Sequence, residues 1–493
     1  EFWLIDIPNA ASVTLDFSVF NVESGYDNLY IYDGDSVNDA LIGSYTGSNS
    51  PGIVTSSSGA ILLEFRSDCS SVSNGWEATY SSVPYDLTAP TTNILVSQTW
   101  QTDDFIVSFE DLDSQSEIAD RFYLIAQSPI GSNEWVGYGD FGFIHESFEV
   151  NDTNWNAVTG SFNVNAGSYS INDLLEQNSN AYSLVEQDNS SKYLYEWSQK
   201  FTSSDINQRA GLHFFCDNPS LPNRGNSYFV FLRESDNKVQ IYSVENDLFT
   251  LESEVNLLIN QGTTYNCKTS YDPTSGWISV YIDDVLVDQW QDSSPLQTGN
   301  SISIRTGGTA SEFDDIKVYR SRLAQENITA GYGQEMSIES VSATPTALIN
   351  TLILDSANNW STNDIEYYLL DFTSPEIDFL NDGTANDVDT FYTTTLSGNW
   401  NALDIHSDIS SYEYAIGTLP NLDNIVPWTS AAMSMSLNEI LASPIYGEAY
   451  HISVRAFNGA GLSNQFTSDG QMYLEGLSIT ENALEDALVY PNP

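Results

Sequence analysis

The sequence predicts an all-β protein built as a multi-domain array of β-sandwiches and a jelly roll. Helical hydrophobic periodicity is nearly absent along the 493 residues. Short runs rich in Tyr, Phe, Val, Ile and Thr instead recur every 8–12 residues or so (about the spacing of sandwich strands), and Asn, Asp, Gly and Ser separate them. Because a domain takes roughly 100–200 residues, the length predicts about three or four domains.

The clearest strand predictions follow directly from these runs. They lie at 29–34 (LYIYDG), 61–65 (ILLEF), 228–232 (YFVFL), 239–244 (VQIYSV), 277–282 (WISVYI), 316–319 (IKVY) and 451–457 (HISVRAF). β-Branched and aromatic side chains fit a pleated, half-buried surface, which is why these runs favour strands. Residues 436–442 (SLNEILA) leave a helical turn and a strand edge open as alternatives.

The charge of the chain excludes several classes of partner. Fourteen Lys and Arg stand against 68 Asp and Glu, which gives a formal net charge of −54. Nucleic-acid binding requires cations that neutralise phosphates, so no nucleic-acid partner is expected. Anionic membrane surfaces are disfavoured for the same reason, and no apolar run approaches the ~18 residues of a membrane span. The charge is compatible with cations, neutral glycans or basic proteins.

Residues 1–83 resemble a CUB domain, a β-sandwich of extracellular proteins. The resemblance rests on YDNLYIYDG, then LIGSYTG, then FRSD ahead of GWEATY. The segment lacks the disulfide pairs that are usual in that family. Only three cysteines occur in the chain. Cys216 and Cys267 could form one disulfide bridge or remain two separate buried thiols, and both alternatives stay open.

The CUB resemblance implies a calcium site. In CUB domains that bind calcium, a Glu, the Asp of a Tyr-Asp pair and a later Asp converge, and the matching residues here are Glu23, Asp27 and Asp68. Calcium takes six to eight oxygens, which carboxylates, carbonyls and water supply. The resemblance also implies a contact near Tyr26 that reads a basic side chain of a partner. The alternative is that these acidic residues only form turns.

A second predicted unit is interrupted by an insertion. Residues 84–143 contain the strand-like runs DFIVSFEDLD and RFYLIAQ, as in half of an Ig or fibronectin III-like sandwich. Residues 330–372, with LILDSANNWS, resemble the missing half. We therefore expect a discontinuous sandwich, because an insertion at a loop tip costs little closure entropy.

The inserted segment, 144–329, resembles concanavalin A/laminin G-like jelly rolls. Its carrying features are the opening FEVNDTNW, the hairpin VYIDDVLV and the closing strand FDDIKVY. First and last strands often pair in such folds, so Glu146 is a weaker calcium candidate together with Asp314 and Asp315. The polar loop CDNPSLPNRGNSYF also resembles a lectin site, where guanidinium and amide side chains hold a sugar beside an aromatic ring. Its candidate ligand-binding residues are Arg209, His213, Asn223, Arg224, Asn226 and Tyr228, and a plain ordered loop is the alternative.

Residues 373–475 resemble a fibronectin type III domain through YHISVRAFNGAG. Trp400 and Trp428 are its predicted core aromatics. The acidic loop 381–389 (NDGTANDVD) places oxygen ligands at close spacing but does not match the EF-hand pattern. Residues 476–493 read as a linker that ends in VYPNP, which resembles the start of the sorting domain of type IX secretion cargo in Gram-negative bacteria.

No catalytic constellation emerges from the sequence. The four histidines are scattered without the spacing of paired metal ligands, and there is no G-x-S-x-G elbow. We therefore predict a non-catalytic, calcium-stabilised adhesion protein that binds a glycan or protein ligand at the outer cell surface. The type IX secretion machinery would be its export partner, and no membrane insertion is expected. Two alternatives stay open: the accessory region of a secreted hydrolase with its catalytic domain upstream, and a surface-layer or filament component.

Overall fold

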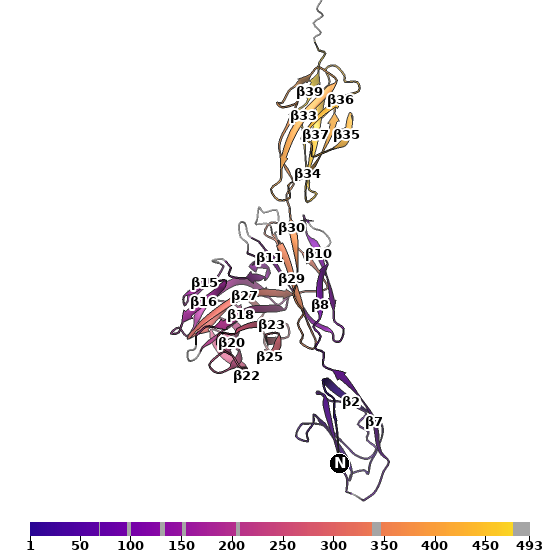
Figure 1. Ribbon diagram of the computed structural model, residues 1–493, viewed down its shortest axis with the longest axis vertical. Coiled ribbons are helices and arrows are strands. Elements are labelled where there is room, and N and C mark those ends of the chain that lie inside the picture. Colours follow the sequence, from indigo (N-terminus) through magenta and orange to yellow (C-terminus); the bar gives the residue numbers. More distant parts are fainter. Residues whose placement is uncertain are drawn as a thin grey trace, which may run out of the picture. The chain divides into compact units, whose positions relative to one another are not determined.

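The computed structural model describes residues 1–68, 70–95, 100–128, 134–149, 154–203, 208–337 and 347–476. The described residues form β-strands and one short 3₁₀ helix, η1 (Gly139–Phe141), and include no α-helix. This confirms the predicted all-β fold class (Figure 1). Within these residues, the protein lacks any helix with the length and apolarity that crossing a bilayer requires.

The chain divides into two compact units, and each is described by itself. The first comprises residues 1–91, 111–120 and 353–362. The second comprises residues 92–110, 121–352 and 363–493.

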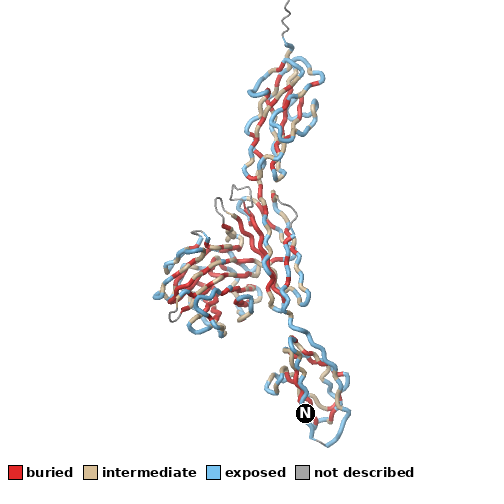
Figure 2. The backbone as a smooth tube through the Cα atoms, in the orientation of Figure 1, coloured by how far each residue is buried: buried red, intermediate tan, exposed pale blue. Residues whose placement is uncertain are grey.

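The first unit contains an antiparallel two-sheet sandwich, which we call the amino-terminal sandwich (residues 2–84). One sheet has the order β1 (Phe2–Asp6), β6 (Ala60–Arg66), β3 (Asn28–Asp33) and β4 (Ala40–Tyr45). The other has the order β5 (Ile53–Thr55), β2 (Ala10–Asn21) and β7 (Gly75–Pro84). Apolar side chains from both sheets form one core, and Figure 2 shows the buried residues on the inside of this sandwich.

Strand β2 explains how the sequence builds this core. Val13, Leu15 and Phe17 are buried at every second position, as expected for a strand with one face toward a core. The register against β7 shifts between Phe17 and Val19, and the next buried residue is therefore Phe20. A bulge of this kind bends the end of the strand and re-aims the residues that follow it. Those residues lead directly into the loop that carries Glu23.

The second unit contains a larger sandwich, which we call the middle sandwich (residues 156–321). Its seven-stranded sheet has the order β14 (Asn156–Thr159), β17 (Ser179–Asp188), β26 (Thr298–Gly307), β19 (Arg209–Cys216), β20 (Ser227–Arg233), β21 (Lys238–Glu245) and β22 (Leu248–Asn256). The opposing sheet includes β25 (Val285–Gln291), β24 (Trp277–Ile282), β23 (Thr264–Tyr271), β18 (Tyr193–Phe201) and β27 (Thr309–Ser321). β13 (Ile144–Glu146) and β16 (Ser168–Asp173) pair with β27, and β15 (Phe162–Asn165) pairs with β16.

The core of the middle sandwich is rich in aromatic rings. Trp197, Phe214 and Tyr271 are fully buried among aliphatic side chains from both sheets. Cys216 and Cys267 are buried free thiols, so the alternative with a bridge between them is wrong. Burial raises the pKa of the Cys216 thiol to about 12, which keeps it protonated and unreactive.

Strands that are distant in sequence pair beside the middle sandwich. β10 (Phe105–Leu112) pairs antiparallel with β28 (Gln325–Ile328), and β8 (Thr91–Leu95) lies on the other side of β10. The sheet that contains β27 continues through β11 (Ile118–Gln127), β29 (Ala347–Asp355), β30 (Asp364–Leu370) and β9 (Trp100–Gln101), while β12 (Val136–Gly137) pairs with β11. All nine residues of β29 are buried, as expected for a strand that is covered on both faces.

The last part of the second unit is a two-sheet module, which we call the carboxy-terminal module (residues 376–473). One sheet has the order β31 (Glu376–Asp382), β33 (Thr395–Leu403) and β36 (Ser436–Ile440). The other has the order β32 (Thr390–Phe391), β39 (Gln471–Tyr473), β37 (Ala449–Asn458), β34 (Ile409–Gly417) and β35 (Val426–Ala432), with β38 (Ser463–Thr467) beside β37.

Two expectations about this module are resolved. Ser436–Ile440 is a strand, which settles the open choice for residues 436–442. Trp400 is 1% exposed in the core, because β33 buries every second residue. Trp428 is only half-buried, and the Arg455 guanidinium lies 4.2 Å from its ring centroid, so its placement in the core was wrong. Trp428 lies on a strand with one solvent-facing side, and there its ring makes a cation–π contact instead of packing in the core.

Candidate functional site

The loop between β2 and β3 positions two of the carboxylates predicted from the sequence. The Asp27 N–H donates to the Glu23 carbonyl at 3.1 Å, which closes a tight turn. Gly25 occupies the left-handed region at φ 80°, where a side chain would be strained. The Thr46 hydroxyl donates to the Glu23 carbonyl at 3.2 Å and accepts from the Gly25 N–H at 2.9 Å. The turn is therefore held both by its own backbone hydrogen bond and by the Thr46 side chain from another segment of the chain.

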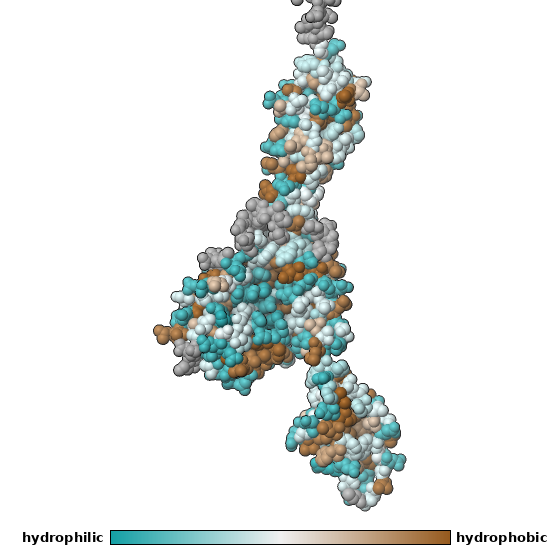
Figure 3. Space-filling view, viewed as in Figure 1, coloured by the Kyte–Doolittle hydropathy of each residue, from teal (hydrophilic) through white to brown (hydrophobic). Residues whose placement is uncertain are grey.

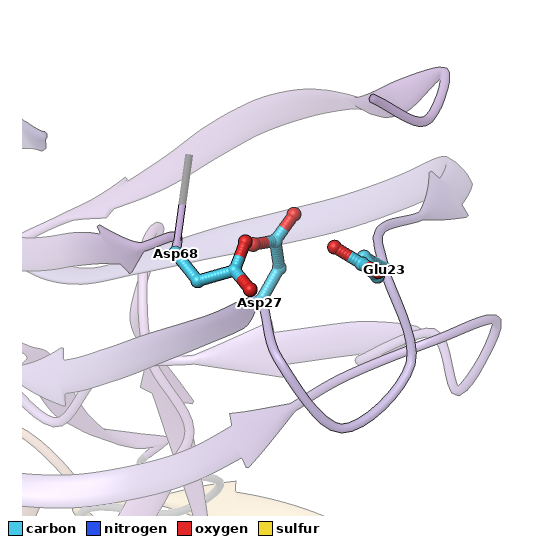
Figure 4. Close-up of side chains that lie close together, drawn as sticks. All are labelled: Glu23, Asp27 and Asp68. Atoms are coloured by element: carbon cyan, nitrogen blue, oxygen red, sulfur yellow. The ribbon is translucent and has the colours of Figure 1, made fainter. Parts of the chain in front are cut away.

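The third carboxylate follows β6, which pairs with β3 directly after the loop that carries Glu23 and Asp27. Asp68 follows the end of β6, and its Oδ1 accepts from the Ser70 N–H at 2.9 Å. Glu23, Asp27 and Asp68 each offer one oxygen, and these oxygens all lie within 4.8 Å of one another. Figure 4 shows the three side chains converging on one region from two segments of the chain.

The electrostatics of this cluster favour a bound cation. Asp27 is 5% exposed, and its Oδ1, like Glu23 Oε2, is buried without a hydrogen-bond partner. Within the described part of the chain, no lysine or arginine forms an ion pair with the three carboxylates. Buried carboxylate oxygens without donors are costly, and a hard cation would satisfy them. The residues present therefore fit calcium, with Asp68 open to solvent.

A hollow lies beside this cluster. It has a volume of about 710 Å³, and Asp27 lines it together with Asn74, Trp3 and Trp76. The Trp3 and Trp76 rings meet edge to face with centroids 5.1 Å apart. Figure 3 shows apolar residues gathered on a face of the same sandwich, within a surface that is otherwise largely polar. The acidic cluster thus adjoins a partly aromatic surface, with Tyr26 64% exposed in the same loop.

The structure adds a second acidic group in the first unit, which the sequence analysis missed. Asp86, Asp113 and Asp355 each bring an oxygen within 4.8 Å of the others. Asp355 is 1% exposed and accepts from the N–H groups of Ala357 and Asn359. The Oδ2 atoms of Asp86 and Asp113 are buried without a partner. The backbone N–H groups of Ser116 and Gln115 hold the pKa of Asp113 below its ordinary value, which favours the charged form.

The weaker calcium candidates of the middle sandwich do not converge. The expected pairing of opening and closing strands is present, with Glu146 opposite Ile316. However, Glu146 Oε1 accepts from the Phe148 N–H at 3.0 Å, and Asp315 pairs with Lys317 at 3.5 Å. Among the described residues, Glu146, Asp314 and Asp315 do not form a group with oxygens within 4.8 Å of one another. The structure does not bring this predicted site together, because the register sets Glu146 opposite Ile316 and not opposite Asp314 or Asp315.

The lectin-like loop proves to be hydrogen-bonded internally. Arg224 and His213 are 0% exposed and Tyr228 is 1% exposed, so these three side chains cannot contact a ligand. The Tyr228 hydroxyl donates to Asp292 Oδ2 at 2.6 Å, and the His213 ring stacks on Phe229 with centroids 4.2 Å apart. Burial, Arg224 and Arg305 lower the pKa of His213, so its imidazole stays neutral. Their assignment as ligand contacts is corrected to a structural role.

The other three residues of that prediction are also engaged. Asn223 donates to the Asp247 carbonyl at 2.7 Å, and Asn226 donates to Asp217 Oδ2 at 2.6 Å. Arg209, at the start of β19, donates to Gln177 Oε1 at 3.0 Å. Asn226 alone of the six lines a hollow of about 450 Å³, together with Asp217 and Asp247. The six residues therefore do not form one open site.

Comparison with known proteins identifies the amino-terminal sandwich. Residues 2–80 match the model of the CUB domain family, which confirms the resemblance predicted for this segment. Residues of the chain are 38% identical over 79 positions to human "Multiple epidermal growth factor-like domains protein 8", covering 16% of this chain and 3% of that protein. They are 35% identical over 98 positions to "Exoskeleton protein RP43" of Riftia pachyptila, covering 18% and 23%.

These curated relatives are matched over a small share of their own length. A structural neighbour is the carbohydrate binding module CBM66 from Bacillus subtilis, with 19% identity and a TM-score of 0.29. That match covers 33% of this chain and 94% of the module.

Proposed function

We propose that the chain is a secreted or cell-surface, non-catalytic multi-module binding protein that calcium stabilises. The observation that carries the proposal is the convergence of Glu23, Asp27 and Asp68 within 4.8 Å, in a segment that matches the CUB family. Two of their oxygens are buried without a partner, which supports a bound cation. Asp86, Asp113 and Asp355 would form a second calcium position for the same reason.

The same proposal places the ligand at the exposed loop beside the first cluster. Calcium would fix Glu23 and Asp27 and present Tyr26 together with Asp68. A basic side chain of a protein partner suits this surface, since the chain carries a formal net charge of −54. A glycan at the middle sandwich is the other ligand class we propose, with the hollow beside Asn226 as its position.

The domain arrangement and the export route belong to the same proposal. We propose that residues 84–143 and 330–372 form one discontinuous sandwich around the insertion 144–329; the adjacency of β11 and β29 in one sheet supports it. Residues 373–475 would be a fibronectin III-like module. Type IX secretion to the outer surface of a Gram-negative bacterium rests on VYPNP at 489–493, which lies outside the described residues.

Removal of calcium should lower the stability of the amino-terminal sandwich. A ligand that binds only the folded state at 100 times its Kd stabilises by about 2.7 kcal/mol, so EDTA should remove roughly that amount. Asp27→Asn should abolish this effect of calcium on residues 2–84, because the substitution neutralises the most buried ligand. Hydrogen exchange of the full chain, with and without EDTA, measures the effect for each sandwich separately.

Asp16→Asn is the matched control, because Asp16 is an exposed carboxylate on β2 outside the cluster. It should keep the full calcium response. Equal protection of residues 2–84 in calcium and in EDTA would contradict the proposed site.

Binding tests the function itself. The labelled chain is applied to a glycan array and to a surface of lysine-containing peptides, in calcium and in EDTA. We expect retention on the peptides in calcium only, with loss in Asp27→Asn and Tyr26→Ala and none in Asp16→Asn. Retention on the peptides that ignores both calcium and Tyr26 would contradict a ligand site at this loop.

A further inference from the structure

A separate group of carboxylates lies in the carboxy-terminal module. Asp382 is the last residue of β31, Asp387 lies in the loop that follows, and Asp469 lies in the turn between β38 and β39. One oxygen from each lies within 4.8 Å of the other two. The sequence analysis noted the acidic loop 381–389, but it did not connect the loop with Asp469, which lies 80 residues further along the chain.

Asp382 supplies the evidence that this group holds a ligand. Its side chain is 0% exposed, and its Oδ2 accepts from the Gly470 N–H at 2.8 Å. Its Oδ1 is buried and has no hydrogen-bond partner. A folded protein leaves such an oxygen unpaired where another group completes its contacts.

The charges around Asp382 identify the missing group as a cation. Asp387 and Asp469 add two exposed carboxylates, and in the described part of the chain no lysine or arginine forms an ion pair with any of the three. His451 lies beside Gly470, but its Nδ1 donates to the Ser468 carbonyl at 3.1 Å. The three ligand atoms of the group are therefore all carboxylate oxygens.

The donor set selects the class of cation. Zinc prefers nitrogen and sulfur ligands, and magnesium demands a strict octahedron, whereas calcium accepts an irregular shell of six to eight oxygens. Three carboxylates on a loop, a strand end and a turn leave room for carbonyls and water to complete such a shell. The geometry therefore favours calcium.

The backbone brings the loop and the turn together. The Asp382 N–H donates to Asp387 Oδ1 at 3.0 Å, and the Val388 N–H donates to the Asp382 carbonyl at 2.8 Å. Gly383 has φ 112°, and a Cβ there would lie 2.7 Å from the Asn386 carbonyl oxygen, so only glycine allows the loop to fold this closely. β31 belongs to one sheet of the module and β39 to the other.

We propose that Asp382, Asp387 and Asp469 form a calcium site that clamps the two sheets of the carboxy-terminal module at one end. The ion would bridge the end of β31 to the turn before β39. The site is independent of the amino-terminal cluster and goes beyond the binding function proposed above.

The test counts bound calcium on the full chain and follows one loop. Native mass spectrometry gives the number of calcium ions per chain, and hydrogen exchange reports on residues 383–389. In the unsubstituted chain, calcium should slow exchange in this loop. Asp469→Asn should remove one calcium ion per chain and this protection; Asp469 is exposed, so the fold should survive the change.

Two further variants make the result specific. Asp382→Asn should have the same effect as Asp469→Asn, while Asp389→Asn removes an equal charge from the same loop outside the cluster and should keep the ion. The calcium response of residues 2–84 should persist in all three variants. The proposal is overturned if Asp469→Asn and Asp382→Asn retain the calcium count of the unsubstituted chain, or if calcium leaves exchange in 383–389 unchanged.

Discussion

Substitution of Arg224 by methionine is expected to destabilise the middle sandwich by about 3–5 kcal/mol, because it strips the donors from several buried acceptors at once. The guanidinium donates five hydrogen bonds from a site that is 0% exposed. Its acceptors are Ser303 Oγ, Asn178 Oδ1 and the carbonyls of Pro222, Ser179 and Ile304, at 2.7–3.0 Å.

Burial and the neighbouring Arg305 lower the pKa of Arg224 to about 9, which shows how far this cation is removed from water. Arg224→Lys should recover only part of the stability, because an ammonium group lacks the planar fork that reaches all five acceptors. Differential scanning calorimetry of the full chain should show one transition lowered by roughly 10 °C in Arg224→Met.

Lys238→Met is the control for this experiment. Lys238 forms an ion pair with Glu254 on the surface of the same sandwich, and such pairs are worth about 0–1 kcal/mol. An Arg224→Met chain that melts like the unsubstituted protein would show that Arg224 is dispensable for the fold, and the ligand role would have to be considered again.

Trp400→Ala should destabilise the carboxy-terminal module by about 3–5 kcal/mol, since it removes a large side chain from a packed core. Trp400 is 1% exposed and meets Tyr412 edge to face, with ring centroids 6.1 Å apart. Its Nε1 is buried without a hydrogen-bond partner, so Trp400→Phe removes an unpaired donor along with part of the ring. Phenylalanine should therefore restore most of the stability that alanine loses.

Trp428→Ala provides the comparison within the same module. The half-buried Trp428 lies under Arg455, and a cation–π contact at an exposed site is worth about 0.5–1 kcal/mol. Urea denaturation, followed by hydrogen exchange in residues 376–473, separates the two effects. Similar losses in Trp400→Ala and Trp428→Ala would contradict the assignment of only Trp400 to the core.

The parts of the site that could be predicted from the sequence are those that match the pattern of a known family. Glu23 and Asp27 lie four residues apart in one loop, and Asp68 follows a recognisable strand, so the family pattern contained all three. The second acidic group could not be predicted from the sequence, because 242 residues separate Asp113 from Asp355. No local sequence pattern indicates that these two residues and Asp86 lie close together. Asp469 escaped for the same reason.

In the lectin-like loop the sequence analysis made the opposite error: it assigned residues to a ligand site that they do not form. Arginine and asparagine in a glycine-containing loop are typical of ligand sites, and composition does not reveal which way a side chain points. Arg224 has φ 67° and turns its guanidinium inward, where it serves the backbone of β17 and β26. Strand positions were easier to predict, because runs of aromatic and β-branched residues mark them locally, as the run 29–34 marks β3.

The pairing of β10 with β28 has a consequence for the time course of synthesis. The ribosome must add more than 200 residues after β10 before β28 emerges, which takes roughly 10–40 s at about 5–20 residues per second. The middle sandwich lies between the two strands and can fold during this interval, while β10 waits with its edge exposed. A nascent chain from which β27 has emerged but β28 has not should therefore hold a folded insertion while the edge of β10 is still unpaired, and that edge is where a chaperone would bind.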